Sequence, residues 1–110
     1  MAKMDLLQGT LDVLILKALS WGPLHGYAVV RWIGQRTEDA LRIEEGALYP
    51  ALHRMEQRGW IEAEWGVSEN NRRAKFYRLT DEGRSQLHAE AVSWQRYAEA
   101  VGKVLHAATA

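Results

Sequence analysis

Four basic residues lie in a ten-residue stretch without an acid, residues 70–79 (NNRRAKFYRL). They are Arg72, Arg73, Lys75 and Arg78. Guanidinium and ammonium groups at this density bind phosphate oxygens, and the preceding asparagines favour a turn that would hold the group in solvent. The pattern indicates local contact with the backbone of a nucleic acid.

A second set of side chains suited to recognition lies in residues 44–59 (EEGALYPALHRMEQRG). Leu48, Leu52 and Met55 are spaced four and three apart, which predicts the buried face of a helix ending at Gly59. Other faces of this helix present Tyr49, Pro50, His53 and Arg54. These side chains can donate to phosphates, touch a thymine methyl group or hydrogen-bond to base edges, as DNA readout requires.

Pro50 needs a structural explanation, because proline has no N–H and disrupts a helix interior. If the helix begins near Glu45 or Gly46, we expect Pro50 at the edge of the first turn, where backbone N–H groups lack acceptors anyway. Two interpretations stay open for Tyr49 and Pro50: DNA contact, or a half-buried tyrosine beside a proline that fixes the helix start. His53 is similarly either a base contact or an ordinary surface histidine.

Catalysis and metal binding have little support. The four histidines are scattered, and none is paired with a second histidine at helical spacing. His88 and Glu90 imitate half of a deaminase zinc motif, but the chain has no cysteine to complete it. Glu44 and Glu45 are better explained as acids at the start of a helix. We therefore expect neither an enzyme nor a cofactor.

The bulk composition limits the architecture to one domain. The chain has 110 residues, of which 47% are hydrophobic, and no cysteine, which suits a reducing cytoplasm. No apolar run approaches the roughly 20 residues that span a bilayer, and no signal peptide is evident. A net charge of zero, from 14 basic and 14 acidic residues, counts against nucleic-acid binding, so the basic stretch is a local feature.

The periodicity predicts an α+β fold that is mainly helical. Helical spacing in residues 4–19, 24–35 and 45–58 is followed by period-2 alternation in residues 60–65 and 74–80. Thr80 is a good N-cap for one long C-terminal helix. Three helices and a hairpin are typical of a winged helix-turn-helix, in which the third helix enters the DNA major groove. We expect this domain in residues 1–79 and a dimerisation helix in residues 80–110.

The long helix carries a heptad seam that predicts a homodimer. Its members are Leu87, Ala91, Trp94, Ala98, Val101, Leu105 and Ala108. The first of these residues can instead pack on their own domain, whereas the chain has little left to cover the seam from Trp94 onward. Trp94 is also a candidate contact for a small aromatic effector, although aromatic residues at helical spacing more often belong to a core.

Four segments together resemble the PadR-like transcriptional regulators, over nearly the whole chain. They are LLQGTLDVLILKAL, GPLHGYAVV, EEGALYPALHRMEQRGWIEAEW and NNRRAKFYRLTDEG. The resemblance implies a homodimeric winged-helix protein, typically a repressor, that binds a palindromic operator in double-stranded DNA. Glu69, just before the wing tip, departs from the more basic wings of the family. The alternative is a winged helix used as a protein-interaction module, for which the basic stretch would have no purpose.

Overall fold

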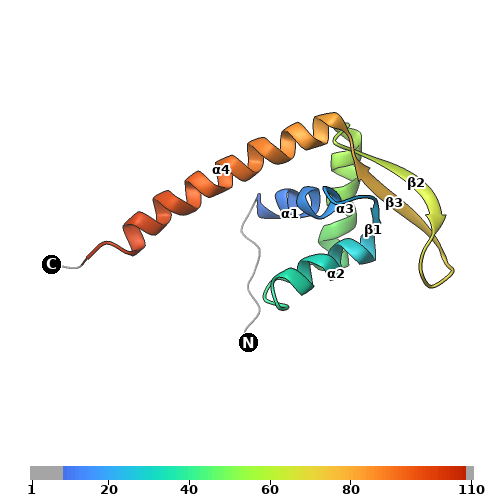
Figure 1. Ribbon diagram of the computed structural model, residues 1–110, viewed down its shortest axis with the longest axis horizontal. Helices are drawn as coiled ribbons and strands as arrows, with labels where there is room; N and C mark the ends of the chain where they lie inside the picture. Colours follow the sequence, from blue (N-terminus) through green and yellow to red (C-terminus); the bar gives the residue numbers. More distant parts are fainter. Residues whose placement is uncertain (1–8, 109–110) are drawn as a thin grey trace.

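The computed structural model describes residues 9–108, which form four helices and three short strands (Figure 1). In chain order these are α1 (Thr10–Leu19), β1 (Leu24–His25), α2 (Gly26–Arg36), α3 (Glu45–Gln57), β2 (Ile61–Val67), β3 (Arg73–Leu79) and α4 (Asp81–Leu105). The order and type of the long elements confirm the predicted mainly helical α+β fold. The part of the first predicted helix that precedes Gly9, including Leu7, lies outside the described residues.

The sheet has three strands, so the prediction of a two-stranded hairpin is incomplete. β2 and β3 pair antiparallel from Ile61 opposite Leu79 to Val67 opposite Arg73. β1 adds to the other edge of β3, with Leu24 opposite Tyr77, which gives the order β1-β3-β2. A strand of two residues is too short to show a period-2 pattern, and for this reason the sequence does not reveal it.

The core lies where α1, α2 and α3 meet the base of the hairpin. The apolar face predicted for the third helix is confirmed, because Leu48, Leu52 and Met55 are all fully buried. They pack in one cluster with buried residues of the other elements, including Ile15, Leu16, Leu19, Val29, Ile33 and Ile61. α1 is buried on several of its residues because α2, α3 and α4 all contact it.

α4 begins as the sequence predicts. The Thr80 hydroxyl accepts a hydrogen bond from the Gly83 N–H at 3.0 Å and donates to the Gly59 carbonyl at 2.6 Å. Asp81 and Glu82 lie in the first turn, where negative charge complements the helix dipole. The cap therefore fixes the helix start and also ties it to the turn between α3 and β2.

Gly83 is required by the close approach of α4 to the start of the sheet. A Cβ atom at this position would lie 1.9 Å from the Trp60 carbonyl oxygen, and this backbone oxygen cannot move away cheaply. The Trp60 carbonyl also accepts from the Thr80 N–H at 3.0 Å. The glycine thus permits helix and sheet to meet at one point.

Beyond its first turns, α4 leaves the domain and projects as a single helix (Figure 1). Its 25 residues correspond to about 37 Å of helix, and the principal extents of the molecule are 60 × 33 × 22 Å. Leu87 packs against the core of its own domain, as expected for the start of the seam. In the described residues, every helix is too short or too polar to cross a membrane.

We predict that Gly83→Ala lowers the free energy of unfolding by about 3 kcal/mol or more, because the added methyl group overlaps the Trp60 carbonyl. Urea unfolding measures this loss. Gly46→Ala is the matched control: this helical glycine has open space around its Cβ position, so alanine should be neutral or stabilising by up to about 1 kcal/mol. Equal stability of the Gly83→Ala variant and the wild type would contradict the packing argument.

Candidate nucleic-acid interface

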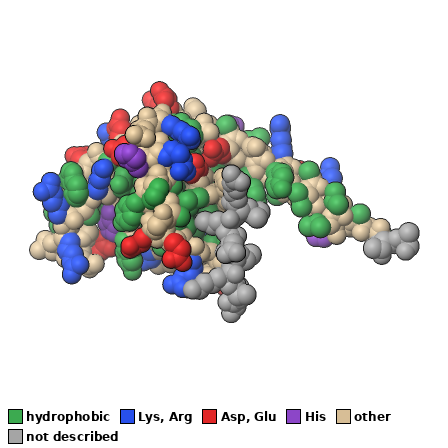
Figure 2. Space-filling view, turned by 180° about the vertical axis from the view of Figure 1, so that it is seen from behind, with side chains coloured by type: hydrophobic (Ala, Val, Ile, Leu, Met, Phe, Trp, Pro, Cys, Tyr) green, Lys and Arg blue, Asp and Glu red, His purple; other side chains and the backbone are tan. Residues whose placement is uncertain are grey.

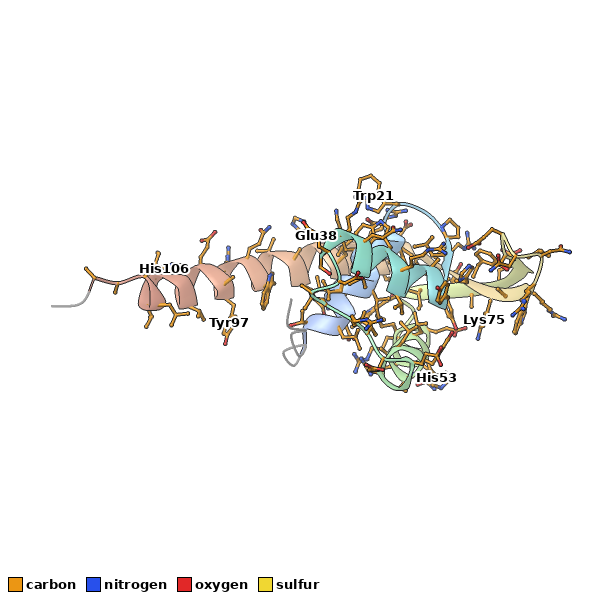
Figure 3. The ribbon with its side chains drawn as sticks, turned by 90° about the horizontal axis from the view of Figure 1, so that it is seen from below. Trp21, Glu38, His53, Lys75, Tyr97 and His106 are labelled. Atoms are coloured by element: carbon orange, nitrogen blue, oxygen red, sulfur yellow. The ribbon has the colours of Figure 1, made fainter. Side chains whose placement is uncertain are left out.

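The outward face of α3 carries the residues that the helical spacing placed there. Tyr49, Pro50 and His53 are exposed, and His53 projects away from the domain (Figure 3). The Tyr49 ring also lies against α2, since a Cβ atom on Gly26 would be 3.0 Å from the Tyr49 hydroxyl. Tyr49 is 48% exposed. It therefore packs against α2 on one side, while solvent still reaches the other.

The expected position of Pro50 at the edge of the first turn is wrong. α3 begins at Glu45, as anticipated, but the Leu48 N–H already bonds to the Glu44 carbonyl at 3.0 Å. Pro50 is two residues further on, where an ordinary residue would donate to the carbonyl of Gly46. Pro50 therefore interrupts the helical hydrogen bonds within α3, and the carbonyl left without a donor belongs to an exposed residue that water can reach.

Arg54, predicted to contact DNA, also forms an ion pair within the protein. Its Nη2 donates to Oδ1 of Asp12 on α1 at 2.6 Å. The Asp12 side chain is only 17% exposed, whereas that of Arg54 is 43% exposed. The ion pair joins α3 to α1 and keeps Arg54 at the flank of the outward face. The two residues are 42 positions apart, so no local pattern could predict the pair.

The basic residues of the wing, the hairpin formed by β2, β3 and their connecting loop, also differ in their surroundings. Arg78 pairs with Glu62 across the hairpin at 2.7 Å, and Lys75 reaches Glu56 on α3 at 3.5 Å. Arg72 and Arg73 are exposed, and no ion pair forms with either in the described part of the chain. Two adjacent arginines without an ion pair in the described residues are therefore at the tip of the wing, at the end of the molecule where Lys and Arg gather in Figure 2.

Trp65 positions one of these two arginines. The Arg73 guanidinium lies 4.7 Å from the centre of the Trp65 ring, on the neighbouring strand, in a cation–π contact. The indole is 58% exposed, although Trp65 lies in the alternating strand pattern. Trp65 was not among the predicted site residues. A signal was available in the sequence: Trp65 lies two positions before the turn, and arginines follow on the facing strand.

A groove of about 620 Å³ lies between the wing and the N-terminal ends of α2 and α3. Aromatic side chains and cations line it together: Tyr27, Tyr49, Trp65, Tyr77, Arg72, Arg73 and Lys75. Burial raises the pKa of the Tyr77 hydroxyl above its ordinary value, with nearby Glu56 acting in the same direction, so this group remains a neutral hydrogen-bond donor. Such a wall can bind a sugar-phosphate strand through cations, hydroxyl donors and ring surfaces.

A second cavity, of about 520 Å³, lies between the start of α1 and the middle of α4. Trp94 and Tyr97 line it, with their ring centres 6.2 Å apart. Glu90 is also in its wall: one carboxylate oxygen accepts from Gln86, and the other is buried without a partner among the described residues. The cavity is on a different part of the molecule from the wing groove, as the position of Tyr97 along α4 shows (Figure 3).

The exposed third helix beside a basic wing defines the class of protein: a winged helix-turn-helix, the architecture of many DNA-binding regulators. Residues 15–89 match the model of the transcriptional regulator PadR-like family, and the chain belongs to this family. PadR-like proteins are transcriptional regulators that bind DNA, and the family is not one of enzymes. In the described residues, no group of three His, Cys, Asp or Glu side chains could hold a metal ion.

Solved structures of transcriptional regulators agree with this assignment, and a curated relative is similar over most of the chain. A transcriptional regulator from Clostridium thermocellum is 30% identical, covers 87% of this chain and 93% of its own, and has a TM-score of 0.79. A PadR family regulator from Eggerthella lenta is 34% identical, covers 92% and 86%, and has a TM-score of 0.77. An uncharacterized protein X of Lysinibacillus sphaericus is 30% identical over 92% of this chain and 93% of its own.

Proposed function

We propose that this DNA-binding regulator is a repressor that binds a palindromic operator as a homodimer. The observation that carries the proposal is the outward face of α3, which lies beside a groove walled by cations and aromatic rings. A protein-interaction module would gain nothing from unpaired arginines at the wing tip. Membership of a family of DNA-binding regulators favours the DNA interpretation further.

In the proposed complex, α3 enters the major groove and the wing contacts the flanking backbone. Pro50 and His53 then face base edges, where the proline ring can pack on a thymine methyl group. Tyr49 lies at the border between α3 and the groove, and its hydroxyl can donate to a phosphate. Arg72, Arg73 and Lys75 neutralise phosphates, and Arg54 supports α3 from its flank through Asp12.

The homodimer is supported by the apolar face that α4 exposes after it leaves the domain. Its large apolar side chains are between 37% and 75% exposed: Trp94, Tyr97, Val101, Val104 and Leu105. Tyr97 and Val104 each precede a seam position by one residue, so they widen the predicted seam. Ala98, also exposed, would allow close approach of a second α4, which is the partner that a heptad pattern fits. One recognition helix reads too few base pairs for a specific address, so two are needed.

Binding to a labelled fragment of the DNA upstream of its own gene tests the proposal. We predict that log affinity falls linearly with log salt, and that Arg73→Ala flattens this slope by about one unit because one phosphate contact is lost. Arg96→Ala, an exposed residue of α4 away from the wing, should leave the slope unchanged. Transcription in vitro from the same fragment should fall as protein is added. Absence of binding to the fragment at low salt would refute the proposal.

Trp94→Ala is predicted to weaken the dimer about tenfold or more, because it removes the largest apolar side chain of the seam. Sedimentation equilibrium measures the dissociation constant. Gln95→Ala, the next residue along α4 and off the seam, is the control and should leave that constant unchanged. An undiminished dimer in the Trp94→Ala variant would mean that another surface joins the two copies.

We also propose that the cavity beside Trp94 admits a small planar aromatic cation as effector. Two aromatic rings provide stacking surface, and the partly unpartnered carboxylate of Glu90 provides the counter-charge. Quenching of tryptophan fluorescence by 9-aminoacridine should therefore be strong in the wild type and largely lost in Trp94→Phe. Trp21→Phe is the control, because Trp21 is exposed on another side of the molecule (Figure 3). Equal quenching in both variants would argue against this site.

A further inference from the structure

Glu69, the acid that makes the wing less basic than expected, joins the wing loop to α2. Its Oε1 accepts from Nη2 of Arg31 at 3.1 Å, and its Oε2 lies 3.4 Å from Nε2 of His25. These partners are 38 and 44 positions away in the sequence. The carboxylate is therefore engaged on both oxygens by an element that lies outside the wing.

His25 provides a buried anchor for this contact. Its Nδ1 accepts from the Ala28 N–H at 3.1 Å and so caps α2. A nitrogen that accepts cannot carry the proton of a neutral ring, so the hydrogen-bond pattern assigns that proton to Nε2, which faces Glu69. The imidazole, which is 9% exposed, thus links the first turn of α2 to the wing.

The wing loop is compact, so a hold on Glu69 restricts the whole loop. The Ser68 N–H donates to the Arg72 carbonyl at 2.8 Å, and the Asn71 N–H donates to the Ser68 carbonyl at 2.9 Å. Asn71 adopts a left-handed conformation with φ of 57°, which closes the turn. Glu69 therefore lies inside a small ring of backbone hydrogen bonds that ends at Arg72, next to Arg73.

The electrostatic effect of Glu69 on DNA is reduced by this arrangement. A hydrogen bond from its own backbone N–H lowers the pKa of Glu69 to about 2, and Arg31 and His25 contribute in the same direction. The group stays ionised near neutral pH, but Arg31 at 3.1 Å offsets its charge. An unpaired acid at this position would only repel phosphates. A paired acid repels them less and can also hold the loop in place.

We propose that Glu69 is a positioning residue, which holds the wing loop against α2 so that Arg72 and Arg73 face the groove before DNA arrives. The inference rests on the proposed function, in which the wing contacts the DNA backbone. A loop that is ordered in advance loses less conformational entropy on binding, and DNA is bound more tightly as a result. The acid at the wing tip therefore raises affinity for a polyanion.

Glu69→Ala separates this role from simple charge, because the two predict changes of opposite sign. If Glu69 only repels phosphate, its removal tightens DNA binding. If it positions the wing, its removal weakens binding, by about two- to tenfold for one or two freed side chains. The control is Glu64→Ala: Glu64 is an exposed acid of β2 that forms no ion pair within the described residues, and its loss changes the net charge equally. Glu64→Ala should bind DNA as tightly as the wild type or more tightly.

Hydrogen exchange in the protein without DNA supplies the second measurement. The amides of Ser68 and Asn71 should exchange faster in Glu69→Ala and in Arg31→Gln than in the wild type, and Glu64→Ala should not change them. Weaker DNA binding together with faster exchange supports the proposal. Tighter binding by Glu69→Ala, or weaker binding with unchanged exchange, overturns it. If even the wild type ignores DNA, the proposed function fails, while exchange still reports whether Glu69 holds the loop.

Discussion

The junction of Trp60, Thr80 and Gly83 determines how the long helix α4 is oriented relative to α3 and the wing. The hydroxyl and the N–H of Thr80 donate to the Gly59 and Trp60 carbonyls, and the missing side chain of Gly83 lets α4 start directly against the sheet. α3 ends at Gln57, about one turn before Trp60, and the first strand of the wing begins at Ile61, directly after Trp60. The direction of α4 relative to α3 is therefore fixed by backbone contacts, which are less tolerant of change than side-chain packing. In a dimer joined through α4, this angle would set the separation of the two recognition helices.

Local pattern and tertiary contact explain which parts of the fold and site the sequence could predict. The buried face of α3, the hairpin and the cap at Thr80 each depend on residues within a few positions of one another, and they were predicted. β1 was missed because two residues show no period. The partners of Arg54 and Glu69 are about 40 positions away, so only the folded chain brings Asp12, Arg31 and His25 to them. The predicted position of Pro50 was wrong for a narrower reason: the helix start was right, but the Leu48 N–H, two residues before Pro50, already bonds to the Glu44 carbonyl.

The net charge of zero is reconciled with DNA binding by the way the ion pairs are distributed. Asp12, Glu56 and Glu62 each neutralise a cation that lies on α3 or on the strands of the wing. Arg72 and Arg73 at the wing tip keep their charge, and Trp65 orients one of them. The net charge averages the paired and the unpaired cations, whereas the tip of the wing presents unpaired ones to a phosphate. The paired cations stiffen the surface on which the unpaired ones are displayed.

The interruption at Pro50 has a further consequence for the chemistry of α3. Pro50 has no N–H to donate to the Gly46 carbonyl, four residues earlier. The outward side of the first turns therefore carries a backbone hydrogen-bond acceptor in addition to the side-chain donors of α3. The exocyclic amino groups of adenine and cytosine are donors in the major groove. This acceptor belongs to the peptide chain itself. Alanine scanning of every side chain on α3 except the proline would therefore leave it in place.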